Sequence, residues 1–280
     1  MGQVRGVRRL SFGDLAVRSA ALGYLGLMVV VPILALFALA FEGGLAAFWK
    51  EVTRREALSA MTLTVEMSIL ATAITVAAGL WIAWTLKRRE FIGKGALEAI
   101  IDLPLAIPAT VAGLVLLSLY GPKGFLGTLL GSHGIEVVFA KPGILLALLF
   151  VTLPLMVRTL QPAMDELEPD VELASFTLGA TRLGTFRRIT LPALFPALAA
   201  GASLTVARAL GEFGSLVLIA GNIPFRTEVA PTYLYARIES SEPAAASAVA
   251  VVLLLASVSM LLAIEYLQVR ARRTRRQAKK

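Results

Sequence analysis

Residues 19–41 read SAALGYLGLMVVVPILALFALAF, an unbroken run without Asp, Glu, Lys or Arg. A helix that crosses the hydrocarbon core of a bilayer needs about 20 predominantly apolar residues. Because this run reaches that length and brings no charged side chain into lipid, it predicts a membrane-spanning helix. The composition agrees, since 57% of the 280 residues are hydrophobic and 16% are charged, whereas soluble domains average about 25% charged residues.

Comparable apolar stretches recur along the chain. The fifth is interrupted by Arg208 and Glu212, and one long helix is preferred there because two short ones would move the following loop to the other side of the membrane. We find no linker or low-complexity tract, so residues 19–268 form one transmembrane domain. The sequence predicts an all-α polytopic membrane protein with about six spans, near residues 19–41, 61–86, 98–120, 142–162, 193–220 and 243–266.

The basic residues indicate an orientation. The net charge is +8, with 27 Lys and Arg, and short loops rich in these residues stay in the cytoplasm. With the N-terminus inside, most of them fall on the cytoplasmic side, in the segment 1–18, the loop 163–192, the shorter loop before the third span and the tail 269–280. Both termini are therefore expected in the cytoplasm. The charge is interpreted as a topology signal with some contact to membrane lipid, and no nucleic-acid partner is expected.

Few residues suited to enzyme chemistry are present. The chain has no Cys and one His, His133, which excludes metal sites built from Cys or His clusters. One His in a Gly-rich stretch also gives no credible Ser-His-Asp arrangement. The pair Gly93-Lys94 lacks the register of a GxxxxGK[ST] nucleotide-binding loop. We expect no catalytic residues, no metal site and no cofactor in this chain.

Two ionisable residues, Arg208 and Glu212, lie within the fifth predicted span. Their i, i+4 spacing places both on one side of a helix. Ionisable groups at membrane depth are costly and often mark a transport path. Two interpretations stay open. The pair belongs to a translocation path or gate, where Arg208 attracts an anion, or it is a structural pair that holds the fifth span against its neighbours.

The cytoplasmic loop contains DVELASFTLGATRLGTFRRITLP (170–192), which predicts two short helices. One is expected to end near Gly179, because glycine suits the residue that follows a helix. The second is expected to stop at Pro192. Small residues in this loop, at Ala174, Ser175, Gly179 and Ala180, allow close approach by another protein surface.

A second candidate contact surface follows the fifth span on the outside. Asn222, Arg226 and Glu228 lie there within a Gly- and Pro-containing loop. The spacing leaves two interpretations open, contact with an external partner and plain solvation.

The segment 172–192 resembles the cytoplasmic EAA loop of binding-protein-dependent ABC importer permeases, whose pattern is EAA, three residues, Gly, nine residues and Ile-x-Leu-Pro. Gly179 is followed by nine residues and then by Ile-Thr-Leu-Pro (189–192). The first half departs from the pattern, because Leu173 takes the place of the Glu and Glu172 lies one position earlier. The resemblance implies an ATPase-coupling loop that includes Glu172, Ala174, Ser175, Gly179, Ala180, Ile189, Leu191 and Pro192.

Other segments resemble the sulfate/thiosulfate and molybdate branch of these permeases. They are DLPLAIPATVAGL (102–114), YGPKGFLG (120–127), ARALGEFGSLVLIAGNIPFRTEVAP (207–231) and AIEYLQ (263–268). TEVAP and the LQ ending look more like the sulfate branch.

The resemblance implies a type I ABC permease fold in the bacterial inner membrane and a function in importing an oxyanion, sulfate or thiosulfate. It also implies three kinds of protein partner: a pair of ABC ATPase subunits that bind ATP and Mg²⁺, a second permease chain or copy, and an extracytoplasmic anion-binding protein. Two alternatives stay open. One is a molybdate/tungstate permease, and the more distant one is an ion-driven secondary transporter that uses Glu212.

Overall fold

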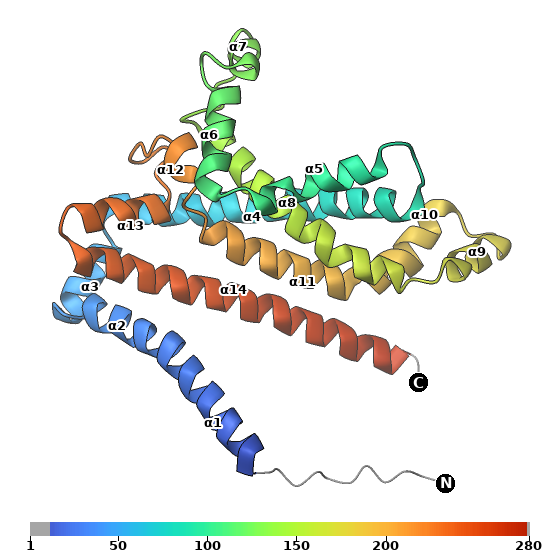
Figure 1. Cartoon of the computed structure of the whole chain (residues 1–280), viewed down its shortest axis with the longest axis horizontal. Coiled ribbons are helices and arrows are strands. Elements are labelled where there is room, and N and C mark those ends of the chain that lie inside the picture. The colour runs from blue at the N-terminus through green and yellow to red at the C-terminus, as the bar shows by residue number, and fades with distance from the viewer. Residues whose placement is uncertain (1–11, 279–280) are drawn as a thin grey trace.

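The computed structural model describes residues 12–278, and the regular elements in this range are all helical (Figure 1). The predicted segments 1–18 and 269–280 lie partly outside these residues. In chain order the elements are Phe12–Leu25 (α1), the π-helix Gly26–Val30 (η1), Val31–Ala40 (α2), Gly44–Val52 (α3), Arg55–Arg88 (α4), Lys94–Ala106 (α5), Ala109–Tyr120 (α6), Phe125–Gly131 (α7), Lys141–Asp165 (α8), Pro169–Thr177 (α9), Arg182–Thr185 (α10), the π-helix Phe186–Thr190 (η2), Leu191–Leu210 (α11), Leu216–Ile219 (α12), Ala230–Glu239 (α13) and Pro243–Ala278 (α14).

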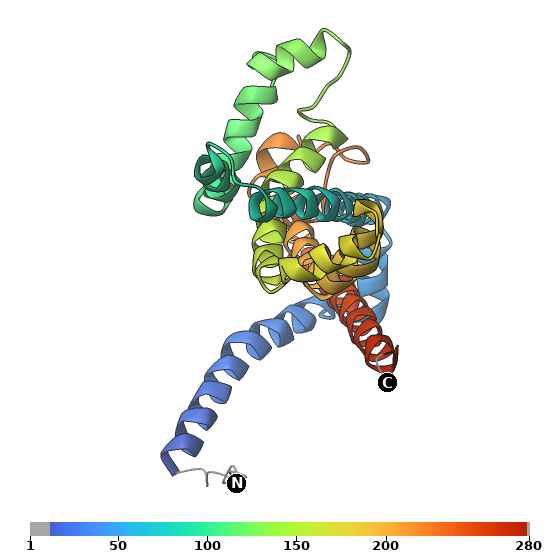
Figure 2. The same cartoon turned by 90° about the vertical axis from the view of Figure 1, so that its right-hand side faces the viewer.

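Five helices of the described chain are long and apolar enough to cross a membrane, and the bent pair α5–α6 would make a sixth span. The five are Val17–Ala40, Arg55–Arg88, Lys141–Asp165, Arg182–Leu210 and Pro243–Tyr266. The predicted all-α fold with about six apolar spans is therefore confirmed. The first span extends away from the other helices, while α6 and α7 project on the opposite side (Figure 2).

The core lies where α4, α8 and α11 cross. Met156 of α8 is fully buried between Gly79 of α4 and Gly201 of α11. A Cβ on Gly79 would lie 2.6 Å from Met156 Cγ, and a Cβ on Gly201 would overlap the Met156 sulfur. Small residues at such crossings let helix backbones approach closely. One turn away, the hydroxyls of Thr75 and Thr152 share a hydrogen bond of 3.1 Å between α4 and α8.

The third predicted span, 98–120, is not a single straight helix. The chain bends by 115° between α5 and α6. Ile107, at the bend, has extended backbone angles. The cause is Pro108, because the proline ring disfavours a helical conformation of the residue before it. Pro104, four residues earlier, lies inside α5.

The fifth predicted span, one helix over 193–220, is wrong at its C-terminal end. Helix α11 ends at Leu210, and α12 starts only at Leu216. The intervening segment contains Gly211 and Gly214, which favour non-helical backbone. Glu212 also competes with the helix, because its carboxylate accepts hydrogen bonds from the Ser215 backbone N–H at 2.9 Å and from the Ser215 hydroxyl at 2.7 Å.

The second helix predicted in the loop 163–192 does not stop at Pro192. Helix α10, η2 and α11 follow one another without a gap, so residues 182–190 are continuous with the fifth span. A proline inside a regular helix lacks an N–H donor, and its ring meets the preceding turn. Here the π-helix η2 directly precedes α11, and its wider turn shifts the hydrogen-bond register. The helix can therefore continue through the proline.

The two broken spans pack against each other at their breaks. A Cβ on Gly113 of α6 would lie 2.7 Å from the Ser215 carbonyl oxygen and 2.8 Å from Ser215 Cα. A Cβ on Gly214 would lie 2.7 Å from Ala109 Cβ at the start of α6. Glycine is required on both sides of this contact, because the neighbouring atoms include backbone that cannot rotate away.

We expect Gly113→Val to destabilise the protein, because the added side chain must displace the Ser215 backbone. Overpacking of this kind costs typically about 1–3 kcal/mol. Thermal unfolding of the purified protein in detergent measures the loss. Gly95→Val is the matched control, since Gly95 also lies in a helix and a Cβ there meets no heavy atom within 4 Å. Equal melting temperatures for the two variants would contradict the packing argument.

Candidate functional site

The first candidate site is the ion pair at the end of α11. Arg208 Nη1 contacts Glu212 Oε2, as the i, i+4 spacing predicts. Glu212 is 1% exposed, whereas the side chain of Arg208 is 37% exposed. The other carboxylate oxygen, Oε1, accepts both hydrogen bonds from Ser215. Each carboxylate oxygen therefore has its own partner, Ser215 on Oε1 and Arg208 on Oε2, and the Arg208 side chain remains partly exposed.

This arrangement bears on the two interpretations of the pair. Glu212 is bound by Ser215 and by Arg208, which both belong to its own chain segment. Within residues 12–278 no hydrogen bond or ion pair joins Glu212 to another span. The pair therefore does not tie the fifth span to a neighbour through polar contacts. A guanidinium has five N–H donors, and in the described chain Arg208 has no second acidic partner. The remaining donors can contact an anion.

Sequence reasoning missed Ser215, although its i, i+3 spacing from Glu212 is a signal. It also missed the ion pair between Asp102 of α5 and Arg158 of α8. Arg158 Nε donates to Asp102 Oδ1 at 2.7 Å, Nη2 contacts Oδ2, and Nη1 donates to Gln161 at 2.9 Å. Such bidentate pairs are strong and geometrically specific. Opposite charges in two neighbouring predicted spans were the available signal.

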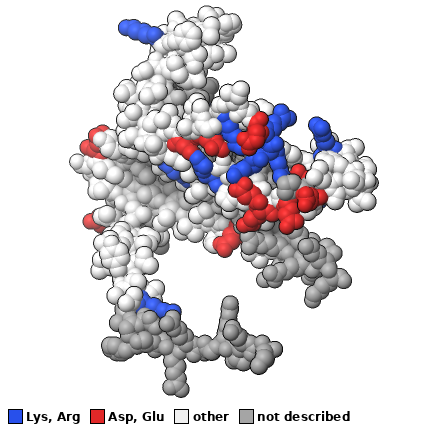
Figure 3. Space-filling view, turned by 45° about the vertical axis from the view of Figure 1, so that its right-hand side comes forward, with Lys and Arg blue, Asp and Glu red and all other residues white. Residues whose placement is uncertain are grey.

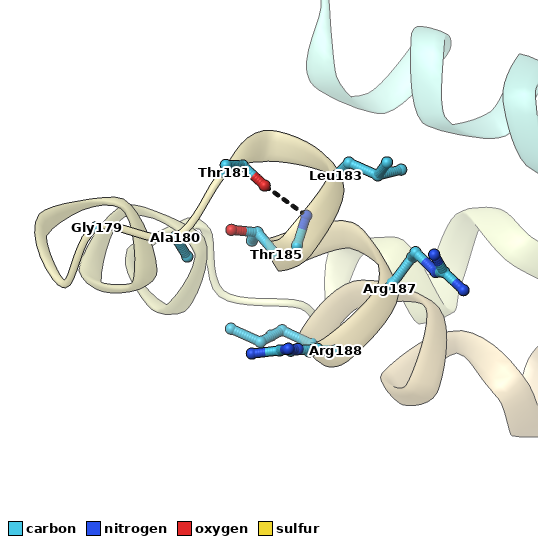
Figure 4. A pocket seen from close by; sticks show the side chains of 9 residues that line it. Gly179, Ala180, Thr181, Leu183, Thr185, Arg187 and Arg188 are labelled. Carbon is cyan, nitrogen blue, oxygen red and sulfur yellow. Dashed lines mark hydrogen bonds between the residues drawn. The ribbon is translucent and has the colours of Figure 1, made fainter.

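The second candidate site is the coupling segment, α9 and α10 with the corner between them. Gly179 has a φ of +85°, and its N–H donates to the Phe176 carbonyl at 3.0 Å. This is the expected left-handed residue just after a helix C-terminus. Thr181 then caps the N-terminus of α10, because its hydroxyl oxygen accepts a hydrogen bond from the Gly184 N–H at 3.1 Å (Figure 4).

Glu172 fixes the inner side of this segment. Its carboxylate accepts a hydrogen bond from the Thr190 hydroxyl at 2.8 Å and lies 3.4 Å from Arg88 Nη2 at the end of α4. Buried Ser175 forms a second link, because its hydroxyl shares a hydrogen bond of 2.7 Å with Thr185. Although Glu172 is one position away from the EAA pattern, it joins α9 to η2 and to the end of a membrane span.

The outer side of the segment is apolar and open. Leu173, Leu178 and Leu183 are 58%, 88% and 65% exposed. A hollow of about 780 Å³ lies behind the corner, between Gly179 and the turn that carries Arg187 and Arg188 (Figure 4). Of the predicted coupling residues, Ala174, Gly179 and Ala180 are exposed, while Glu172, Ser175, Ile189, Leu191 and Pro192 are buried or half-buried. The first three can contact another protein, and the others anchor the segment.

The predicted external residues lie in the loop between α12 and α13. The Ile223 carbonyl accepts hydrogen bonds from three following N–H groups, including those of Arg226 and Glu228. Asn222 has a φ of +49°, and its side-chain oxygen is buried. Burial raises the pKa of the half-buried Glu228 carboxyl above its usual range, although nearby Arg237 opposes this shift. Of the three, Arg226 is the exposed one.

Comparison with known proteins identifies the family. Residues 75–273 match the family described as "Binding-protein-dependent transport system inner membrane component". The "Sulfate transport system permease protein CysT" of Salmonella typhimurium is 40% identical over 94% of this chain and 95% of its own length. The protein of that name from Synechocystis is 41% identical over 89% of this chain and 87% of its own length.

The fold also matches a solved structure. A bacterial ABC transporter involved in the import of the acidic polysaccharide alginate has a TM-score of 0.78, with 17% identity, over 91% of this chain and 94% of that chain. At this identity the similarity concerns the fold alone. From the sequence match, the chain belongs to the family of binding-protein-dependent transport system inner membrane components.

Proposed function

We propose that this chain is the permease subunit of an ATP-driven ABC importer that moves sulfate into the cytoplasm. The observation that carries the proposal is the 40% identity to a sulfate permease over 94% of this chain and 95% of that protein. Similarity over nearly the full length of both chains includes the broken fifth span and the coupling segment. It favours sulfate over molybdate.

The two candidate sites fit the two tasks of such a subunit. The exposed corner at Gly179, with apolar Leu178 and Leu183 beside it, is suited to docking on an ATPase subunit. At the other site, the buried carboxylate of Glu212 orients Arg208 at the break in the fifth span. A half-exposed guanidinium at membrane depth can stabilise a doubly charged oxyanion during its passage.

The proposal includes partners and a location. A pair of ATPase subunits binds ATP and Mg²⁺ on the cytoplasmic side, a second permease chain or copy completes the pathway, and an external binding protein delivers the anion. The chain lies in the bacterial inner membrane with both termini in the cytoplasm. ATP binding closes the ATPase pair, and the continuous α10–η2–α11 helix carries this movement from the coupling corner to Arg208.

An uptake assay with labelled sulfate tests the proposal. Cells without sulfate uptake of their own would express the chain together with its partner subunits. We expect sulfate uptake that stops when ATP is depleted, competition by unlabelled sulfate and thiosulfate, and weak competition by molybdate. Uptake that survives ATP depletion but collapses with the proton gradient would indicate a secondary transporter. Strong competition by molybdate alone would indicate a molybdate permease.

A further inference from the structure

A second hollow, of about 700 Å³, lies on the inner side of the coupling segment. It is bordered by the last turns of α4, by α9, and by α10 with η2. Charged side chains of both signs gather over this end of the molecule (Figure 3). Neither the proposed import path nor the exposed ATPase-docking corner uses this groove.

The groove carries positive charge that the protein does not neutralise. Arg88 is paired, because its guanidinium contacts Glu172 and donates to the Leu167 carbonyl at 3.3 Å. Arg89 and Arg182 also line the groove. Both are exposed, and within residues 12–278 neither forms an ion pair. Two cations from separate elements, the end of α4 and the start of α10, therefore remain available to one ligand.

The aromatic side chains point to the kind of ligand. Trp81 and Trp84 line the same groove from α4, and Trp81 is 75% exposed. Trp84 is half-buried, with its ring centroid 4.9 Å from that of Phe186. Tryptophan is enriched at the level of lipid headgroups, where its ring is apolar and its N–H is wet. Trp81 lies about 12 Å along the helix from Arg89, at about 1.5 Å per residue.

We propose that this groove binds the phosphate headgroup of an anionic phospholipid. Arg89 and Arg182 would contact the phosphate, and Trp81 would lie against the first part of the acyl chains. The order along α4, with aromatic residues before basic ones, follows the order of acyl chain and phosphate in a cytoplasmic leaflet. A soluble oxyanion would satisfy the two arginines, but it gives no role to the exposed indole of Trp81, about two turns deeper.

Fluorescence quenching by brominated lipids tests this site. The full chain carries three Trp residues, so Trp49→Phe leaves Trp81 and Trp84 as reporters. In nanodiscs we expect brominated phosphatidylglycerol to quench them several-fold more effectively than brominated phosphatidylcholine. Arg89→Gln with Arg182→Gln should abolish this preference. Arg187→Gln with Arg188→Gln is the matched control, because it removes the same charge from the adjacent turn and should leave the preference unchanged.

Three results would overturn the proposal: equal quenching by the two lipids, a preference that survives the Arg89/Arg182 double substitution, or the same loss in the control. The quenching measurement is repeated with inorganic sulfate or phosphate added at millimolar concentration. If either abolishes the preference, the groove takes a soluble oxyanion instead of a lipid. Arg89→Lys with Arg182→Lys guards against misfolding, because it keeps both charges and should retain the preference.

Discussion

Replacing Gly179 with tryptophan is expected to reduce ATP-driven uptake by at least about tenfold, equivalent to about 1.4 kcal/mol, while the chain still inserts into the membrane. A Cβ on Gly179 meets no heavy atom within 4 Å, so a large side chain has room there, although the positive φ of Gly179 strains any other residue. The tryptophan side chain would occupy the surface that we propose docks on the ATPase. Uptake, and stimulation of the complex's ATPase by the binding protein, measure the effect.

Gly179→Ala and Gly179→Asn separate docking from backbone strain. The φ of +85° is unfavourable for any side chain, at a cost of roughly 1–2 kcal/mol for most residues. Alanine pays this cost with little added bulk, and asparagine tolerates left-handed backbone better. We expect both to retain most uptake at matched membrane levels. If alanine is as inactive as tryptophan, strain is responsible, and intact uptake with tryptophan would remove the docking role.

The spans could be predicted because lipid imposes a simple requirement on sequence. A spanning helix satisfies its own backbone hydrogen bonds and needs apolar side chains, so the charge-free run 19–41 is unambiguous. Which of the prolines and glycines within a span actually breaks the helix could not be predicted. Pro104 and Pro108 lie four residues apart, yet the first is inside α5 and only the second marks a bend. Pro192 does not end its helix at all.

In the polar sites, too, the contacts within one segment could be predicted, whereas those that depend on packing between distant elements could not. The contact between Arg208 and Glu212 was predicted from their i, i+4 spacing. It forms although α11 ends at Leu210, two residues before Glu212. The full exposure of the Gly179 corner and the burial of Asn222 depend on how distant elements pack, and spacing carries no information about either. The pairing of Asp102 with Arg158 likewise requires two helices to be placed side by side.

Glu212→Ala is expected to abolish sulfate uptake and to lower stability. The substitution removes the acceptor for both Ser215 hydrogen bonds and leaves Arg208 without its counter-charge. Breaking a buried ion pair from one side costs about 3–5 kcal/mol. Because Arg208 is partly exposed, water can solvate its charge and offset part of this cost. We therefore expect a loss of stability of about 3 kcal/mol, at the lower end of that range. Thermal unfolding in detergent and uptake at matched expression measure the two effects.

The double variant Arg208→Met with Glu212→Gln separates the structural role from the transport role. Replacing both partners of a polar pair can be nearly neutral, and the glutamine oxygen still accepts from Ser215. Stability should therefore recover toward that of the original protein. Uptake should stay lost, as in Arg208→Met alone, because the cation that faces the anion is absent, whereas Arg208→Lys should retain part of it. Normal uptake in Arg208→Met at normal expression would contradict the anion-binding role. The ion pair would then have only a structural role, at the break between α11 and α12.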